Sequence, residues 1–106
     1  MGKINSKQKG KQGELAFVHL LKDSGYDAHR SQQYSGADAD ADVESKLPFH
    51  FEVKRVEKLN IDKAMEQAIN DSDERAPVVA HRKNRKDWLI TMRFDDWIKL
   101  IRELYI

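Results

Sequence analysis

Cysteine is absent from this chain of 106 residues, and so is any long apolar run. Without cysteine there is no disulfide framework and no thiolate metal site. No hydrophobic stretch approaches the roughly 20 residues of a membrane-spanning helix. The first residues are polar and lack the apolar core of a secretory signal peptide. These absences favour a cytoplasmic protein without a membrane partner.

A strong net charge is also missing, since the formal value is only +1. A nearly neutral chain does not bind DNA by bulk charge alone. The cations nevertheless crowd the N-terminus and residues 82–86, and acids gather at residues 38–44. This distribution allows two basic arms on either side of an acidic site filled by a cation. The sequence contains no histidine pair at zinc spacing and no internal repeat.

The length suits one domain over residues 1–106, with residues 1–9 as a flexible basic arm. Apolar periodicity predicts the following elements. Helices are expected over residues 11–24, 61–72 and 95–104, and strands over residues 26–34, 38–44, 49–55, 77–80 and 88–92. In the first helix Leu15, Val18 and Leu21 recur at helical spacing, with Phe17 and Leu20 alongside, and Asn60 is a candidate N-cap of the second helix. The last two strands are continuous apolar runs, which predicts that both are central and buried. The order of elements predicts an α/β fold, a mixed sheet flanked by helices.

Residues 49–55 alternate between apolar and polar side chains, as a strand with one face in a core does. The alternation places Glu52 and Lys54 side by side on the face opposite the phenylalanines. His50 shares this face, and we interpret it as a bystander. An acid beside a base is a common surface pattern, so the pair needs further support.

That support comes from the preceding strand. If the chain turns around Leu47, Asp42 lies opposite Glu52 with Cβ atoms about 5 Å apart. Two carboxylates in this arrangement repel each other unless a cation lies between them, and Mg²⁺ suits such a site. A slip of two residues would make Asp40 the ligand instead.

Glu14 is a third candidate acid. It precedes Val18 by four residues and Leu21 by seven, so it shares the apolar face of the first helix. An acid on such a face is costly unless it is paired or coordinated. We therefore expect Glu14 to point toward the two other acids.

Taken together, Gly13-Glu14, Asp42-Val43, Glu52-Val53-Lys54 and a helical Gln67 resemble the PD-(D/E)XK nuclease superfamily. Within it, the chain is similar to small phage and archaeal Holliday-junction resolvases and to stand-alone VRR-NUC nucleases. The resemblance spans about residues 10–92 and implies the restriction-endonuclease-like fold. One departure is Ala41, which stands where the family name has proline.

The resemblance also implies roles for individual residues. The positions that match the family's catalytic set are Glu14, Asp42, Glu52, Lys54 and Gln67. Asp42 and Glu52, with the backbone carbonyl of Val53, would hold Mg²⁺ or Mn²⁺. Lys54 would activate or position the attacking water, and Glu14 would support a water on the metal or a second ion.

Two basic segments are candidate DNA contacts. The first is the expected hairpin tip, which carries Arg82, Lys83, Arg85 and Lys86. The second is the N-terminal arm, which carries Lys7, Lys9 and Lys11. Cations in these positions can bind phosphates and orient a duplex.

The last expected helix has a wide apolar stripe that includes Trp97, Ile101 and Leu104. Core packing is its first explanation. A homodimer is expected as well, because so short a chain offers little area to a four-way junction. The sequence and its resemblance to this superfamily predict a metal-dependent DNA endonuclease in a bacterium or phage-infected cell, and the resemblance alone implies branched DNA as its substrate. The alternatives are a non-catalytic DNA-binding module on the same fold and a subunit that cuts only beside a partner.

Overall fold

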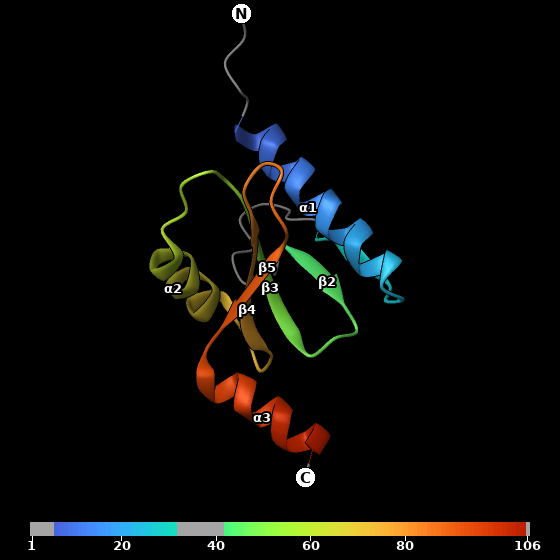
Figure 1. The fold of residues 1–106 in the computed structure, drawn as a ribbon, viewed down its shortest axis with the longest axis vertical. Helices are drawn as coiled ribbons and strands as arrows, with labels where there is room; N and C mark the ends of the chain where they lie inside the picture. Colours follow the sequence, from blue (N-terminus) through green and yellow to red (C-terminus); the bar gives the residue numbers. More distant parts are fainter. Residues whose placement is uncertain (1–5, 32–41, 106) are drawn as a thin grey trace, which may run out of the picture.

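The computed structural model describes residues 6–31 and 42–105. In chain order its elements are α1 (Ser6–Asp23), β1 (Ala28–Arg30), β2 (Val43–Ser45), β3 (Phe49–Arg55), α2 (Ile61–Asp71), β4 (Ala76–Arg82), β5 (Leu89–Met92) and α3 (Phe94–Tyr105) (Figure 1). The strands form one sheet in the order β1-β2-β3-β4-β5. Among the strands of the described residues, only the pairing of β3 with β4 is parallel. The predicted order of elements and the predicted mixed sheet are therefore confirmed.

Element boundaries follow the sequence closely where the pattern is strong. β3 has the predicted bounds, and α2 ends one residue before the predicted end. α1 begins at Ser6, five residues earlier than predicted, so Lys7 and Lys9 belong to this helix, and the part of the predicted flexible arm before Ser6 lies outside the described residues. Within the described residues, the predicted strands over residues 26–34 and 38–44 correspond to β1 and β2. Residues 32–41, which include Asp38 and Asp40, lie outside the described part of the chain.

The larger core lies between α1 and one face of the sheet. Phe17 and Val18 of α1 are buried against Phe51 and Val53 of β3, and the rings of Phe17 and Phe51 meet edge to face at 5.1 Å. Leu15 and Leu20, which the helical period also assigned to the apolar face, remain more than a third exposed. The helical period therefore located the packing face of α1 correctly but overestimated its width.

A smaller core covers the other face of the sheet. Ala64 and Ala68 of α2 are buried against Val79 of β4. α2 begins at the predicted cap, where the side chain of Asn60 accepts a hydrogen bond of 3.0 Å from the backbone N–H of Lys63. Small alanines let the helix approach the sheet closely, so polar side chains on this face of β3 are covered as well.

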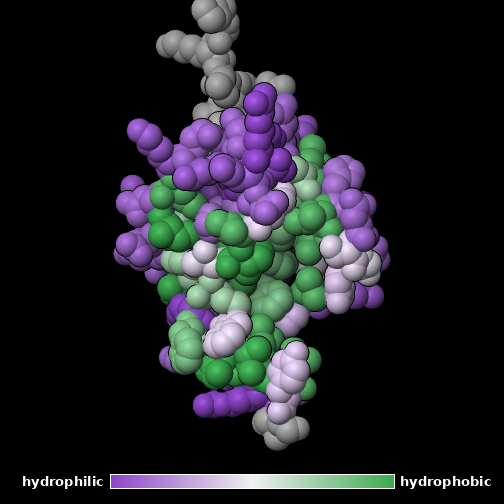
Figure 2. All heavy atoms as spheres, viewed as in Figure 1, coloured by the Kyte–Doolittle hydropathy of each residue, from purple (hydrophilic) through white to green (hydrophobic). Residues whose placement is uncertain are grey.

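The C-terminal part of the fold corrects two expectations. β5 was predicted to be central, yet it is an edge strand in which Leu89 and Ile90 are 56% and 54% exposed. α3 was predicted to pack into the core, but it contains no buried residue and extends away from the sheet (Figure 1). Figure 2 shows hydrophobic side chains gathered on α3 and hydrophilic ones at the opposite end of the molecule. None of the helices within residues 6–31 and 42–105 could span a bilayer.

Candidate active site

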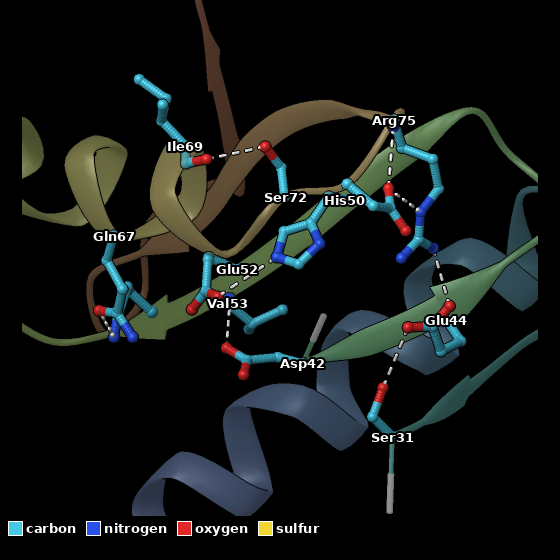
Figure 3. A network of polar contacts seen from close by, with 12 residues as sticks. Ser31, Asp42, Glu44, His50, Glu52, Val53, Gln67, Ile69, Ser72 and Arg75 are labelled. Atoms are coloured by element: carbon cyan, nitrogen blue, oxygen red, sulfur yellow. Dashed lines mark hydrogen bonds and ion pairs between the residues drawn. The ribbon is translucent and has the colours of Figure 1, made fainter. Parts of the chain in front are cut away.

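Asp42 contacts the neighbouring strand directly. Val43 is paired with Phe51, which is the register expected for a turn around Leu47. The backbone N–H of Asp42 donates to the carbonyl of Phe51 at 2.8 Å. The Asp42 Oδ2 atom accepts a hydrogen bond of 2.9 Å from the backbone N–H of Val53 (Figure 3). Asp42 is thus held against β3 at the point where Glu52 and Lys54 leave that strand.

Glu52 is almost completely buried, with an exposed fraction of 2%. Its register partner on β4 is Val79, which places it on the face covered by α2. His50 on the same face is fully buried, and its Nε2 atom lies 3.6 Å from Glu52 Oε1. The sequence assigned these residues to one polar face, and only the packing of α2 shows that this face is largely closed to solvent.

Two further residues reach this site from the helices. Lys54 Nζ donates to Gln67 Oε1 of α2 at 3.4 Å. Glu14 of α1 accepts a hydrogen bond of 2.8 Å from the guanidinium Nε of Arg30, with the Glu14 side chain 19% exposed. Placing the Glu14 carboxylate on an apolar helix face was expected to cost desolvation free energy. The ion pair with Arg30 offsets that cost.

The electrostatics of Asp42 show that these groups are close together. Burial, and then the negative charge of Glu52, raise the pKa of the Asp42 carboxyl from 3.8 to about 7. Glu14 adds a smaller rise, whereas the hydrogen bond from Val53 and the charge of Lys54 lower the pKa. The Asp42 carboxyl therefore lies within electrostatic range of two other carboxylates and one ammonium.

The donor set at this site fits a hard divalent cation. Across residues 6–31 and 42–105, no three histidine, aspartate or glutamate side chains are grouped closely enough to enclose an ion on their own. Mg²⁺ does not require such a cage, because it is commonly held by one or two carboxylates and keeps several waters. The mutual repulsion of Asp42 and Glu52 is the feature that a cation would relieve.

A second polar network lies apart from these acids. Arg75 Nη1 donates to Glu44 at 2.8 Å, and Ser31 Oγ donates to the same carboxylate at 3.4 Å (Figure 3). Asp73 accepts from Arg75, and this hydrogen bond lowers the pKa of Asp73 to about 2. The network ties the loop before β4 to β2, so its role is structural.

The predicted DNA contacts fall into two groups. Arg82, Lys83 and Lys86 line a pocket at the β4–β5 hairpin, and Arg85 is exposed at its turn with a φ of 61°. Lys11 is exposed on α1, and Lys7 and Lys9 lie in the first turns of the same helix.

Three residues near the site, namely Arg30, His50 and Arg55, were not assigned to it from the sequence. Arg30 pairs with Glu14, and His50 is buried beside Glu52. Arg55 of β3 lies next to Arg82 of β4, and the Nε atoms of both are buried without a hydrogen-bond partner among the described residues. The alternation of β3 did place His50 on the face of Glu52, where it was interpreted as a bystander, and it gave no sign that His50 would be buried. No local signal in the sequence identified Arg30 or Arg55, because the residues beside them come from other elements.

Gly13 provides a test of how closely α1 must approach the sheet. A Cβ atom at Gly13 would lie 3.0 Å from the Cβ of Arg55, whereas a Cβ at Gly10 would meet nothing within 4 Å. Gly13→Ala is expected to destabilise the protein by about 1 kcal/mol or more, because the clash outweighs the gain in helix propensity. Gly10→Ala, on the same helix, should instead stabilise it by about 0.5–1 kcal/mol. Urea denaturation of both variants checks this prediction, and an equal gain in both would contradict it.

Comparison with known proteins agrees with the geometry. The sequence model of a family described as "Phage putative PDDEXK endonuclease" matches residues 5–105. Among solved structures, the chain is similar to Hjc, a Holliday junction resolvase from Archaeoglobus fulgidus, with a TM-score of 0.59 and 20% sequence identity. The similarity covers 79% of this chain and 72% of the archaeal one, and at this identity it concerns the fold. No curated protein matches the chain.

Proposed function

Because this chain belongs to the family of phage PD-(D/E)XK endonucleases, we propose that it cuts DNA in a reaction that requires Mg²⁺ or Mn²⁺. The observation that carries the proposal is the contact between Asp42 and β3, which brings Asp42 beside Glu52 and Lys54. Acids and a lysine in this arrangement suit phosphodiester hydrolysis. The phage family and the DNA substrate support a location in the cytoplasm of a bacterium or an infected cell.

In this proposal Asp42 and Glu52 hold the divalent cation, together with the backbone carbonyl of Val53. A bound cation would polarise the scissile phosphate and lower the pKa of water. The buried position of Glu52 excludes bulk water from one side of the site, which strengthens its interaction with positive charge. The hydrogen bond from Val53 fixes the Asp42 carboxylate in one orientation.

Lys54 positions the attacking water and offsets the negative charge that develops on the phosphate. Its ammonium is oriented by Gln67 of α2, so helix and strand must keep their relative position for this step. Glu14 reaches the site from α1 and is oriented by Arg30. We assign Glu14 the role of supporting a water or a second ion at the site.

Branched DNA is the proposed substrate. The support is the shared fold with a protein that is itself a Holliday junction resolvase, together with the cations of the β4–β5 hairpin and α1. These cations would contact the DNA backbone and so orient the substrate without reading its sequence.

We also propose that the enzyme acts as a homodimer through α3. On this helix Phe94, Trp97, Leu104 and Tyr105 are 67%, 45%, 72% and 78% exposed. An amphipathic helix with so much exposed aromatic surface is typical of an interface. Trp97→Glu is expected to convert a dimer into a monomer in sedimentation velocity, whereas Lys99→Glu on the same helix should not. Identical monomeric profiles for the wild type and both variants would contradict this proposal.

The proposed activity is tested with labelled four-way-junction, flap, linear duplex and single-stranded DNA, each with Mn²⁺ or EDTA. The expected result is cleavage that requires the metal, is fastest on the junction and is lost in Lys54→Ala. Cleavage only in the presence of a partner protein would indicate an obligate subunit of a larger nuclease. DNA binding without cleavage in any metal would contradict the proposed activity and favour a non-catalytic binding module.

A further inference from the structure

A pocket of about 570 Å³ lies beside the site, and none of the catalytic residues proposed above lines it. It is formed between the loop that joins β3 to α2 and the β4–β5 hairpin, two segments that run next to each other in Figure 1. Its size falls in the range of pockets that bury a small organic ligand. The pocket therefore has room for one nucleotide-sized group.

The pocket begins close to Lys54. Val56, one of its lining residues, follows Lys54 by two positions, and two residues of a strand span roughly 7 Å. His81, another lining residue, is the register partner of Lys54 on β4. A DNA strand with its scissile phosphate at Lys54 would thus present the adjoining nucleotide to this pocket.

One wall of the pocket is apolar. Val56, Leu59, Ile61 and Leu89 all line it, and they come from the β3–α2 loop, the start of α2 and β5. Leu89 is 56% exposed although it belongs to a strand, so it offers open apolar surface on the pocket side. Apolar surface of this kind suits the flat face of a base, and contact with a base face does not depend on its identity.

The pocket is also lined by four cations, which together are called its cationic rim. Lys58, Arg82, Lys83 and Lys86 line it, against two acids, Glu57 and Asp87. Glu57 is itself engaged, because its carboxylate accepts a hydrogen bond of 2.6 Å from the backbone N–H of Asn84. The cationic excess suits phosphate groups.

The rim is also held in shape. The contact between Glu57 and Asn84 ties the β3–α2 loop to the hairpin, so both sides of the pocket are connected. The hairpin turn is closed by a hydrogen bond of 3.2 Å from the N–H of Lys86 to the carbonyl of Lys83. Arg85 adopts a left-handed backbone conformation in this turn. A pocket that is preformed in this way binds with less loss of conformational entropy.

We propose that this pocket binds one unstacked nucleotide of the DNA, with the base against Leu89 and the neighbouring apolar side chains and the phosphates against the cationic rim. The inference rests on the proposed function, and it refines the substrate class. DNA with an unpaired nucleotide beside the cut is bound in preference to continuous duplex, in which every base is stacked and paired.

Leu89 and Ile90 allow a matched test, since they are adjacent on β5 and almost equally exposed, and only Leu89 lines the pocket. The experiment measures binding by the full-length protein in EDTA, using fluorescence polarisation. The probes are two DNA duplexes that differ at a single position. The first duplex is paired at this position, and the second carries an unpaired 2-aminopurine nucleotide there.

The expected result is that the wild type and Ile90→Ser prefer the unpaired duplex, and that Leu89→Ser loses this preference by about tenfold or more. Affinity for the paired duplex should be the same in all three proteins. The fluorescence of 2-aminopurine should rise on binding to the wild type as the base leaves the stack. Equal affinity of the wild type for both duplexes, or the same loss in Leu89→Ser and Ile90→Ser, would overturn the inference.

Because no metal is present, this test does not depend on cleavage. If the Leu89 variant did not differ from the Ile90 variant, the proposed nucleotide binding in this pocket would be overturned. The proposed nuclease activity would not be affected by that result. Failure of the proposed function would appear instead as uncut DNA in the Mn²⁺ assay.

Discussion

Replacement of Glu52 by glutamine is expected to slow DNA cleavage by roughly 10²–10³-fold, the scale at which removal of one electrostatic group affects an enzyme. The substitution keeps the shape of the side chain and removes only its negative charge. Glu52 is 2% exposed, so no solvent molecule can readily replace the lost carboxylate. The rate should be measured under single-turnover conditions with Mn²⁺ in excess.

The matched control for this variant is Glu66→Gln, which makes the same chemical change at an exposed position of α2. It should cut at the wild-type rate. Because glutamine is neutral, the Glu52 variant should also fold at least as stably as the wild type in EDTA, since the substitution removes the repulsion between the Glu52 and Asp42 carboxylates. An unchanged cleavage rate in Glu52→Gln would remove this residue from the catalytic set.

Asp42→Asn is expected to stabilise the metal-free protein at pH 8. The Asp42 pKa of about 7 lies above its unfolded value of 3.8 because of burial and the nearby charge of Glu52. Between about pH 4 and pH 7 the folded state therefore holds a proton that the unfolded state has released. Stability falls as the pH rises through this window, and above it the full cost of the buried charge is present. The cost is on the order of a few kcal/mol, since each pKa unit corresponds to about 1.4 kcal/mol.

The measurement is urea unfolding in EDTA at pH 5 and pH 8. The difference between wild type and Asp42→Asn should be larger at pH 8, whereas Asp27→Asn, an exposed control, should show no such pH dependence. Asparagine can still accept the hydrogen bond from Val53, so only the charge is lost. Addition of Mg²⁺ at pH 8 should then stabilise the wild type and not the Asp42 variant. An equal response of both proteins to Mg²⁺ would argue against Asp42 as a ligand.

Local patterns in the sequence predicted much of this site. The alternation of Phe49–Arg55 identified β3 with its bounds, and the spacing around Leu47 predicted the register that brings Asp42 beside β3. Asn60 was recognised as a helix cap from its position alone. These features depend on residues close together in the chain, where backbone periodicity and short turns leave few alternatives.

Features that depend on distant elements were predicted less well. The burial of His50 was not foreseen, because it requires α2 to cover that face of the sheet. The ion pair of Glu14 with Arg30 joins α1 to β1, and no spacing along the chain indicates it. The pocket beside Lys54 likewise arises only when the β3–α2 loop meets the β4–β5 hairpin.

The C-terminal region shows most clearly where the sequence stops being decisive. The apolar runs of β5 and α3 were interpreted as core, since hydrophobic surface usually becomes buried within its own domain. In the structure β5 is an edge strand and α3 leaves the sheet, so the same apolar residues remain exposed. The sequence by itself determined which residues are apolar, which are acidic and how they alternate. Only the tertiary structure decided what covers each face. Burial depends on two surfaces that meet, whereas the sequence pattern of one element describes only the surface of that element.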